Sequence, residues 1–430
     1  MKVHLMGIGG AGVSALARVF LARGDDVSGC DVKESDTTAE LEDAGVRIEI
    51  GHDPEHVLFQ DLLVYSGAVK SAEELDAARA MGVKVVSRAE MLAELIAGSD
   101  SIAVAGSAGK TTVTHMTGHI LTEAGLDPTV LVGDGSSTRI GRSKVLVAEV
   151  DESDGSLVLH HPRRAIVTNI EFDHPDHFKD VEQVHSLFAQ FVAQLPADGL
   201  AVLCADDERA HSLQTPARRV TYGFNLNADY RCDDRRPFGI HHQGRELGRI
   251  NLRQPGRHNV QNATGAAAMA LEIGVSIADV TGALERFPGA RRRLEFLGIF
   301  QGATVYDDYA HHPTKVKATL QAARELRHRR LIVVFQPHRF SRLAALIHDF
   351  SRSFVGADRV LLLDVYSAGE DNPTGIKAQD LADMIPNGTY VGSFQNAREA
   401  LEGLAGPDDI LLLMGAGDIR KLGDELAQRV

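Results

Sequence analysis

The sequence predicts an α/β protein of three domains, each built on a parallel or mixed sheet. Short apolar segments alternate with amphipathic stretches of helical period through almost all of the 430 residues. Glycine-bearing turns join a strand to a helix at residues 7–12 and 106–109, as in units that bind phosphate. The length exceeds what one core usually holds. We therefore predict domains at 1–98, 99–289 and 290–430.

Composition narrows the function classes. Hydrophobic residues make up 44% and charged residues 24% of the chain, which is typical of a globular protein. The net charge of −14 argues against general nucleic-acid or membrane-surface binding. Cys30, Cys204 and Cys232 have no metal-ligand spacing and fit buried thiols in a reducing compartment. With neither a signal peptide nor an apolar stretch of ~20 residues, we expect a cytoplasmic enzyme without membrane insertion, monomeric or homodimeric.

The first domain opens with a strand at 3–6, a glycine turn at 7–12 and a helix at 13–22. A second strand follows at 26–29, and Asp31 comes just after it. Gly7-x-Gly9-x-x-Gly12 with a later acid is typical of dinucleotide binding. Because such a turn binds a pyrophosphate, any nucleotide diphosphate would serve. A tight turn without a ligand is the alternative. The domain continues with a strand at 62–65 and a helix at 73–80.

The second domain opens with a strand at 101–104, a turn at 105–112 and a helix at 113–124. Backbone N–H groups and the helix N-terminus of such a turn bind phosphate oxygens. Lys110 is placed to neutralise a triphosphate, and the Thr111 hydroxyl to hold Mg²⁺. Only two residues separate Gly106 from Gly109, fewer than in the usual phosphate loop. The alternative is a plain glycine turn with a solvated lysine.

Acidic residues follow the next two predicted strands, at 145–150 and 165–169. Glu149 ends the first strand, and His174 lies shortly after the second. A hard cation prefers carboxylate oxygens, so these strand ends predict an Mg²⁺ site; solvated, loop-capping acids are the alternative. A helix after Glu182, a strand at 200–203 and a β-rich polar stretch at 222–252 follow. His258 and Asn262 lie at the start of a helix at 259–273, either as capping residues or as partners of an adenine or ribose.

The third domain is predicted to have strands at 304–307, 331–335, 359–363 and 410–414, with helices between them. Aspartate, histidine, arginine and tyrosine residues follow the first three strands. The carboxyl edge of an open parallel sheet is where such sheets bind ligands. The run 291–293, three arginines at the domain boundary, is a candidate clamp for phosphate charge; an exposed basic linker is the alternative.

Eight motifs in order resemble the Mur ligases of peptidoglycan synthesis, and among them the branch that adds L-alanine to UDP-N-acetylmuramate. The motifs span all three predicted domains. They lie at residues 7–17, 106–112, 151–156, 168–174, 256–263, 307–314, 336–342 and 414–419.

The resemblance implies an N-terminal Rossmann-like domain, a central P-loop ATPase-like domain and a C-terminal Rossmann-like domain. It also implies ATP and Mg²⁺ as cofactors, with Lys110, His174 and Arg339 as catalytic residues. It places the UDP-sugar on Gly7, Gly9, Gly10, Ala11, Gly12, Asp31 and Ser66, and the remaining substrate on Tyr309, His311, His338, Arg339 and Arg342. It places ATP on Gly106, Ser107, Ala108, Gly109, Lys110, Thr111, Thr112, His258, Asn262 and Arg292, and Mg²⁺ on Thr111, Glu149 and His174.

The implied reaction is an ATP-dependent ligation through an acyl phosphate. Three other functions stay open: a sister ligase that attaches a murein tripeptide to the same nucleotide sugar, a non-catalytic nucleotide-binding paralogue, and an NAD-dependent oxidoreductase that rests on the first glycine turn alone. The family branch usually has threonine and histidine where this chain has Ser107 and Ala108, which leaves the phosphate loop without one side-chain contact.

Overall fold

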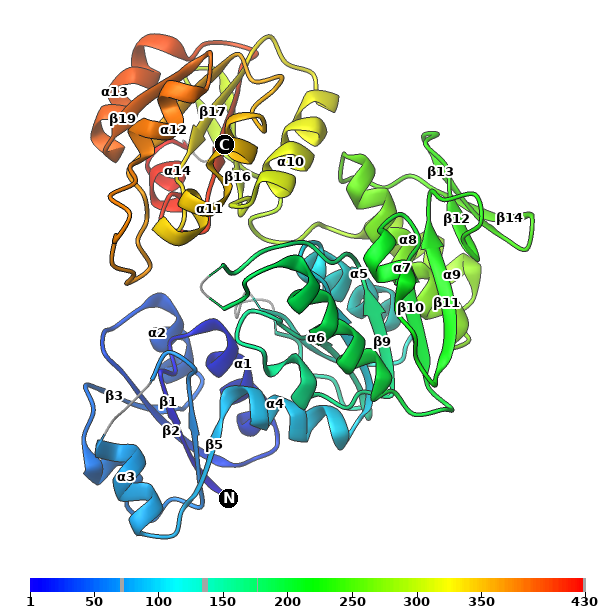
Figure 1. Cartoon of the computed structure of the whole chain (residues 1–430). Helices are drawn as coiled ribbons and strands as arrows, with labels where there is room; N and C mark the ends of the chain where they lie inside the picture. The colour runs from blue at the N-terminus through cyan, green and yellow to red at the C-terminus, as the bar shows by residue number, and fades with distance from the viewer. Residues whose placement is uncertain (70–72, 134–137, 176, 428–430) are drawn as a thin grey trace.

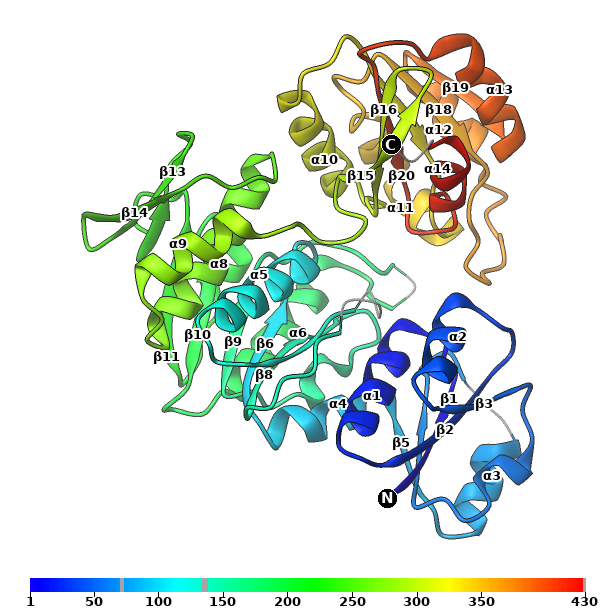
Figure 2. The same ribbon diagram turned by 180° about the vertical axis from the view of Figure 1, so that it is seen from behind.

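The computed structural model describes residues 1–69, 73–133, 138–175 and 177–427. These residues form three sheets, each in its own lobe (Figures 1 and 2). The predicted three-domain α/β architecture is confirmed. Two connections join the sheets: one helix ends at Ala97 before a strand begins at Asp100, and another ends at Arg286 before a strand begins at Glu295. The domain bounds at 98 and 289 stay a prediction.

The N-terminal domain is a parallel sheet in the order β3-β2-β1-β4-β5, which matches the first five strands of the Rossmann order 3-2-1-4-5-6. Residues Ser87 and Glu90 form a capping box that starts the last helix of the domain directly after its last strand. The elements are β1 (Lys2–Met6), α1 (Ala11–Ala22), β2 (Asp26–Asp31), α2 (Asp36–Asp43), β3 (Arg47–Ile50), η1 (Pro54–Val57), β4 (Leu62–Tyr65), α3 (Glu73–Ala80), β5 (Lys84–Ser87) and α4 (Arg88–Ala97).

The central domain is a mixed sheet in the order β14-β13-β12-β11-β10-β9-β6-β8-β7. The polar stretch at 222–252 is rich in β structure, as the sequence predicts, and it forms the antiparallel edge of this sheet. The elements are β6 (Asp100–Ala105), α5 (Lys110–Glu123), β7 (Thr129–Leu131), β8 (Val145–Glu149), η2 (Ser156–Leu159), β9 (Arg164–Val167), α6 (Val181–Ala193), β10 (Leu200–Cys204), α7 (Glu208–Ser212), β11 (Arg218–Gly223), β12 (Tyr230–Cys232), β13 (Phe238–His242), β14 (Arg245–Ile250), α8 (Arg257–Glu272) and α9 (Ile277–Arg286).

The C-terminal domain is a sheet in the order β15-β16-β20-β17-β18-β19, parallel except for the β15–β16 hairpin. The elements are β15 (Glu295–Phe300), β16 (Ala303–Asp308), α10 (Pro313–Glu325), β17 (Leu331–Phe335), α11 (Phe340–Ser351), β18 (Arg359–Leu363), α12 (Ala378–Met384), β19 (Gly388–Gly392), α13 (Phe394–Leu404), β20 (Ile410–Met414) and α14 (Arg420–Leu426).

The apolar core divides the molecule unequally. One continuous cluster of buried side chains runs through the N-terminal and central domains, whereas the C-terminal sheet has a separate cluster on each face. Figure 1 shows the C-terminal lobe reached by the connection that follows α9. The two other lobes are therefore held together by shared apolar packing. Phe172 of the central domain also packs against one of the C-terminal clusters, and polar contacts complete that junction. Within the described residues, no helix is long and apolar enough to cross a membrane.

Candidate active site

Two glycines of the turn between β6 and α5 have backbone conformations that only glycine adopts easily. Gly106 has φ +139° and Gly109 has φ +86°. A Cβ atom on Gly106 would lie 1.9 Å from Thr168 Oγ1, and one on Gly109 would lie 2.7 Å from Asn262 Oδ1. The turn is thus pressed against the end of β9 and against α8, and no larger residue fits at either position.

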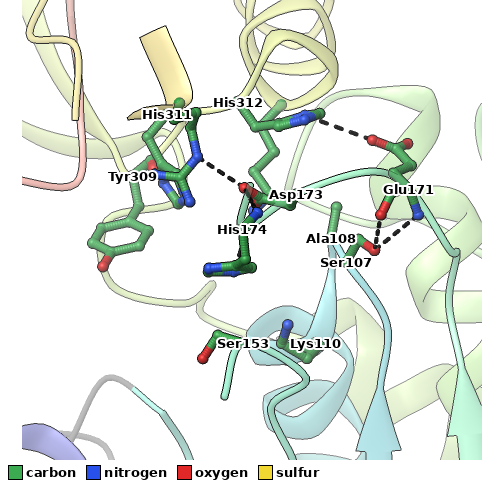
Figure 3. A network of polar contacts seen from close by, with 12 residues as sticks. Ser107, Ala108, Lys110, Ser153, Glu171, Asp173, His174, Tyr309, His311 and His312 are labelled. Atoms are coloured by element: carbon green, nitrogen blue, oxygen red, sulfur yellow. Dashed lines mark hydrogen bonds and ion pairs between the residues drawn. The ribbon is translucent and has the colours of Figure 1, made fainter. Parts of the chain in front are cut away.

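Hydrogen bonds from the end of β9 fix the rest of this loop. The Ser107 N–H donates to the Asn169 carbonyl (3.1 Å), and the Ala108 N–H donates to the Asn169 side-chain oxygen (2.8 Å). The Thr168 hydroxyl donates to the Ala108 carbonyl at 2.6 Å. Ser107 and Glu171 also exchange hydrogen bonds through the serine hydroxyl (Figure 3). The backbone of the loop is therefore well supported without a histidine at position 108.

Lys110 is the first residue of α5, and its ammonium group contacts two carboxylates that follow β8. The Nζ atom lies 2.6 Å from Glu152 Oε2 and 3.2 Å from Asp151 Oδ1. Burial disfavours the charged amine, but the attraction of the nearby carboxylates is stronger than this effect and raises the pKa of Lys110. The lysine is therefore a permanent cation at the mouth of the loop, where a phosphate group would compete with these two carboxylates.

Thr111 and Glu149 supply oxygen atoms beside this lysine. The Thr111 hydroxyl donates to Glu149 Oε1 at 3.1 Å, while Glu149 Oε2 accepts the Gly133 N–H at 2.8 Å. A hydroxyl and a carboxylate next to a phosphate loop are the donors that Mg²⁺ prefers, so these two residues fit that ion chemically.

His174 lies on the other side of the site. Its backbone has φ +57°, and Figure 3 shows its ring on the side toward Lys110 and Ser153. Burial lowers the pKa of the ring below its ordinary value, against the attraction of Asp173, so the ring is neutral at pH 7 and has a free electron pair to offer a ligand. Its role as an Mg²⁺ ligand stays a prediction.

The arginines at 291–293 behave differently from one another. The Arg293 guanidinium donates to the Thr111 hydroxyl at 3.2 Å. Arg292 turns toward its own domain, where it donates to Asp307 (3.1 Å) and to the Gly415 carbonyl (2.7 Å). The sequence prediction chose Arg292 for ATP. In the structure Arg293 is the arginine that touches the phosphate loop, because the positive φ of Arg292 (+54°) directs consecutive side chains to different partners.

A cavity of about 600 Å³ opens next to the loop at the carboxyl ends of β10 and β11. His258, the residue predicted to contact adenine, is part of its lining, and burial lowers the pKa of this ring to about 4. The adenine contact stays a prediction. The Arg257 guanidinium stacks 3.6 Å above the Phe224 ring. Asn262 lies against Gly109 instead of in the cavity lining. Residues of the lining that lie outside the predicted set are Ala205, Asp206, Glu208, Phe224, Asn225, Arg257, Gln261 and Gln321.

Asp173, after β9, joins the central and C-terminal domains. It forms ion pairs with Arg342 of α11 (2.8 Å) and Lys315 of α10 (3.7 Å). Burial works against the carboxylate, but these cations hold the pKa of Asp173 well below its usual range. Lys315 lies outside the predicted set; burial lowers its pKa. His312 adds a hydrogen bond to the Phe172 carbonyl at 3.1 Å.

The predicted substrate residues of the C-terminal domain gather at the ends of β16, β17 and β18. The rings of His311 and His338 lie 5.9 Å apart, and His338 stacks on Tyr366. Burial lowers the pKa of His338 to about 4. Arg339 has φ +69° and contacts Glu370 at 3.3 Å. Tyr309 and His311 face the same space as His174 in Figure 3, so the two domains present one polar surface to each other.

The first glycine turn lies in the N-terminal sheet. Asp31 accepts the Gly9 N–H at 2.9 Å, and Gly10 starts α1 without a side-chain cap, which leaves helix N–H groups to bind an anion. Ser66 packs against Gly7, and Arg88 packs against Gly12. Arg88 also approaches Asp154 of the central domain at 3.9 Å, so this turn lies next to the junction of the two domains.

Three family models together match most of the chain. Residues 2–100 match the Mur ligase family catalytic domain, residues 104–270 the Mur ligase middle domain, and residues 292–417 the glutamate ligase domain of Mur ligases. The chain belongs to the Mur ligase family. As a Mur ligase it is an ATP-dependent ligase, which accounts for the phosphate loop in the central domain.

Relatives and solved structures show which members of the Mur ligase family this chain resembles. It is 41% identical to UDP-N-acetylmuramate--L-alanine ligase of Desulfatibacillum aliphaticivorans, over 100% of this chain and 98% of that protein. It is 42% identical to the protein of the same name from Rubrobacter xylanophilus, over the whole of both. UDP-N-acetylmuramate-alanine ligase MurC from Thermotoga maritima superposes with a TM-score of 0.83 at 27% identity, covering 99% and 98% of the two chains. A murein peptide ligase from Psychrobacter arcticus gives 0.73 at 26% identity over the same shares.

Proposed function

We propose that this Mur ligase joins L-alanine to the carboxylate of UDP-N-acetylmuramate with hydrolysis of ATP, as a step of peptidoglycan precursor synthesis. The observation that carries the proposal is whole-length similarity at 41% and 42% identity to ligases named for this pair of substrates. The higher TM-score to the L-alanine ligase than to the murein peptide ligase, 0.83 against 0.73, favours a single amino acid over a tripeptide as the amine substrate.

In this mechanism the phosphate loop and Lys110 hold the ATP phosphates. The Lys110 ammonium leaves Glu152 and Asp151 for the β- and γ-phosphates and neutralises charge on the transferring phosphoryl group. Arg293 reaches the same loop through Thr111 and adds a second cation. The substrate carboxylate attacks the γ-phosphate, which yields an acyl phosphate and ADP. The amine of L-alanine then attacks the acyl carbon, and inorganic phosphate leaves.

Thr111 and Glu149 would hold Mg²⁺ through their oxygen atoms, with His174 as a third proposed ligand. When bound, the ion would neutralise phosphate charge and orient the triphosphate. His311, His338 and Arg339 would bind the acceptor or the amine from the C-terminal side, while Gly7, Gly9, Gly10, Ala11 and Gly12 bind the UDP group. The buried contacts around Asp173 keep the two domains together and would exclude water from the acyl phosphate.

A substrate panel tests the proposal. Purified protein with MgATP and UDP-N-acetylmuramate is given L-alanine, glycine, L-serine or a murein tripeptide, and phosphate release is measured with product mass. We expect L-alanine to give the highest kcat/KM. Preference for the tripeptide would contradict it in favour of the sister ligase, and no ATP hydrolysis with any amine would favour a non-catalytic paralogue. Lys110→Ala should lower kcat by at least ~10³-fold; retained activity would remove the loop from the mechanism.

A further inference from the structure

Four metal-ligating side chains from distant segments meet in the N-terminal domain, away from the phosphate loop. They are His4 on β1, Cys30 on β2, His56 in η1 and Glu74 in α3. One ligand atom from each lies within 4.8 Å of those of the other three. Nothing in the spacing along the sequence indicates this cluster. The fold creates it where α3 and η1 cover one face of the sheet.

Three of the four side chains of the cluster are buried. His4 is 1% exposed, and Cys30 and Glu74 are both at 0%. The Glu74 carboxylate lies 2.6 Å from His56 Nδ1 and 2.8 Å from His52 Nδ1, while Cys30 Sγ lies 3.5 Å from Glu74 Oε1. A carboxylate in such a place needs positive charge nearby, and imidazoles supply it only when they are protonated.

One ring nitrogen in the cluster lacks a partner. His4 Nδ1 lies 2.9 Å from the Ser28 hydroxyl, and His4 Nε2 is buried with no hydrogen-bond partner among the described residues. A buried, unsatisfied nitrogen costs free energy. Metal-ligating histidines usually have this arrangement: one ring nitrogen is hydrogen-bonded to a polar group, and the other is available to the metal.

We propose that His4, Cys30, His56 and Glu74 bind one divalent transition-metal ion of the Zn²⁺ type. A thiolate, two imidazoles and a carboxylate form a set of four donors that suits tetrahedral Zn²⁺, and the sulfur and nitrogen donors disfavour Mg²⁺ and Ca²⁺. When the metal–sulfur bond forms, the Cys30 thiol loses its proton to solvent. Thr111 and Glu149, in the central domain, form a separate oxygen site.

The ion would also act on the first glycine turn. The Cys30 carbonyl accepts the N–H groups of Gly7 (2.8 Å) and Ile8 (3.1 Å), so the residue that would hold the metal also fixes the start of the turn. Metal binding would tie two strands, η1 and α3 to that turn. We therefore expect it to stabilise the N-terminal domain and, through the turn, the binding of a UDP group.

Cobalt provides the test, because a cobalt–thiolate bond has a charge-transfer absorption in the near ultraviolet that oxygen and nitrogen ligands do not produce. The full chain is stripped with chelator and titrated with Co²⁺, then with Zn²⁺. We expect about one ion per chain, the thiolate band, its loss on Zn²⁺ addition, and a higher Tm with Zn²⁺. The band should vanish in Cys30→Ser and persist in Cys204→Ser, a buried thiol of the central domain.

Zinc-edge X-ray absorption on the unmodified protein covers the case in which Cys30→Ser does not fold. One sulfur and two or more nitrogen neighbours around Zn²⁺ would support the site. The proposal is overturned if Co²⁺ gives no thiolate band with the unmodified chain, if the band survives in Cys30→Ser, or if the zinc neighbours include no sulfur. A cluster held only by hydrogen bonds would bind no metal through Cys30 and would give no thiolate band.

Discussion

Arg342 of α11 and Asp173 of the central domain form a buried ion pair across the domain junction, with 2.8 Å between Nε and Oδ1. The two side chains are 2% and 4% exposed. Phe172, next to Asp173, packs against an apolar cluster of each domain, so this ion pair adds to apolar packing in docking the C-terminal domain. Removing one partner leaves the other charge buried and unpaired, which costs far more than an exposed pair is worth.

Arg342→Met should therefore weaken domain docking by about 3–5 kcal/mol. We expect a larger radius of gyration by small-angle X-ray scattering and a kcat/KM at least ~100-fold lower. Arg352→Met, at an exposed arginine after the same helix, is the control and should change neither. The double variant Asp173→Leu with Arg342→Met should be more compact than Arg342→Met alone. Additive losses in the double variant would show that the two residues act independently.

Arg293→Ala should raise the KM for ATP by about 10–100-fold, since a hydrogen bond to a charged group contributes ~1.5–3 kcal/mol. Arg293 is the arginine that contacts Thr111 of the phosphate loop. Arg291→Ala, at an exposed position two residues earlier, should leave the KM for ATP within about twofold. Initial rates at varied ATP measure both. An equal effect of the two substitutions would mean that general positive charge, and not this contact, matters.

Gly106→Ala should abolish ATP hydrolysis and destabilise the protein by more than ~3 kcal/mol. The new Cβ would lie 1.9 Å from Thr168 Oγ1 at a backbone φ of +139°. Gly403 in α13 has open space around its Cα and no positive φ, so Gly403→Ala should be neutral or stabilising by up to ~1 kcal/mol. Urea unfolding midpoints and phosphate release compare the two. Near-normal activity in Gly106→Ala would show that the loop rearranges in solution.

His160 should make stability depend on pH. It is 1% exposed, and burial, with Arg88 nearby, lowers its pKa from 6.5 to about 4. As pH falls below 6.5 the unfolded chain binds a proton that the folded chain does not, so the free energy of unfolding decreases until about pH 4. The contribution is on the order of 3 kcal/mol at most. His160→Gln should reduce the fall of the urea midpoint between pH 7 and 4.5, while His161→Gln, at an exposed neighbour, should leave that fall unchanged.

The position of the site could be predicted from the sequence because parallel sheets bring the carboxyl ends of their strands to one edge. That rule predicts the acids after β8 and β9 beside the phosphate loop, and it gathers the groups after β16, β17 and β18 at one edge of the C-terminal sheet. Helix starts were less accurate: α1, α5 and α8 begin two or three residues before the predicted starts at 13, 113 and 259. The first residues of these three helices have a helical backbone, but their sequence lacks the helical spacing of apolar residues, so it gives no sign that the helix has begun.

Contacts set by side-chain direction could not be predicted. Three consecutive arginines look alike in the sequence, but in the structure Arg292 contacts its own domain and Arg293 contacts the phosphate loop. Lys315 approaches Asp173 from another domain, so no spacing along the chain relates them. The cluster around Cys30 could not be predicted for the same reason. Its four members are spread from residue 4 to residue 74, and the spacing between the three cysteines carries no information about them.

Arg293 lies in the connection between α9 and β15, so the segment about which the C-terminal domain would turn also touches the phosphate loop. Any rotation that separates the domains would withdraw this arginine from the nucleotide. If Arg293 contributes binding free energy to the nucleotide, then by linkage the bound nucleotide must stabilise the docked orientation by the same amount. ATP affinity and domain orientation are then two measures of one equilibrium, and a probe of either should titrate with the other.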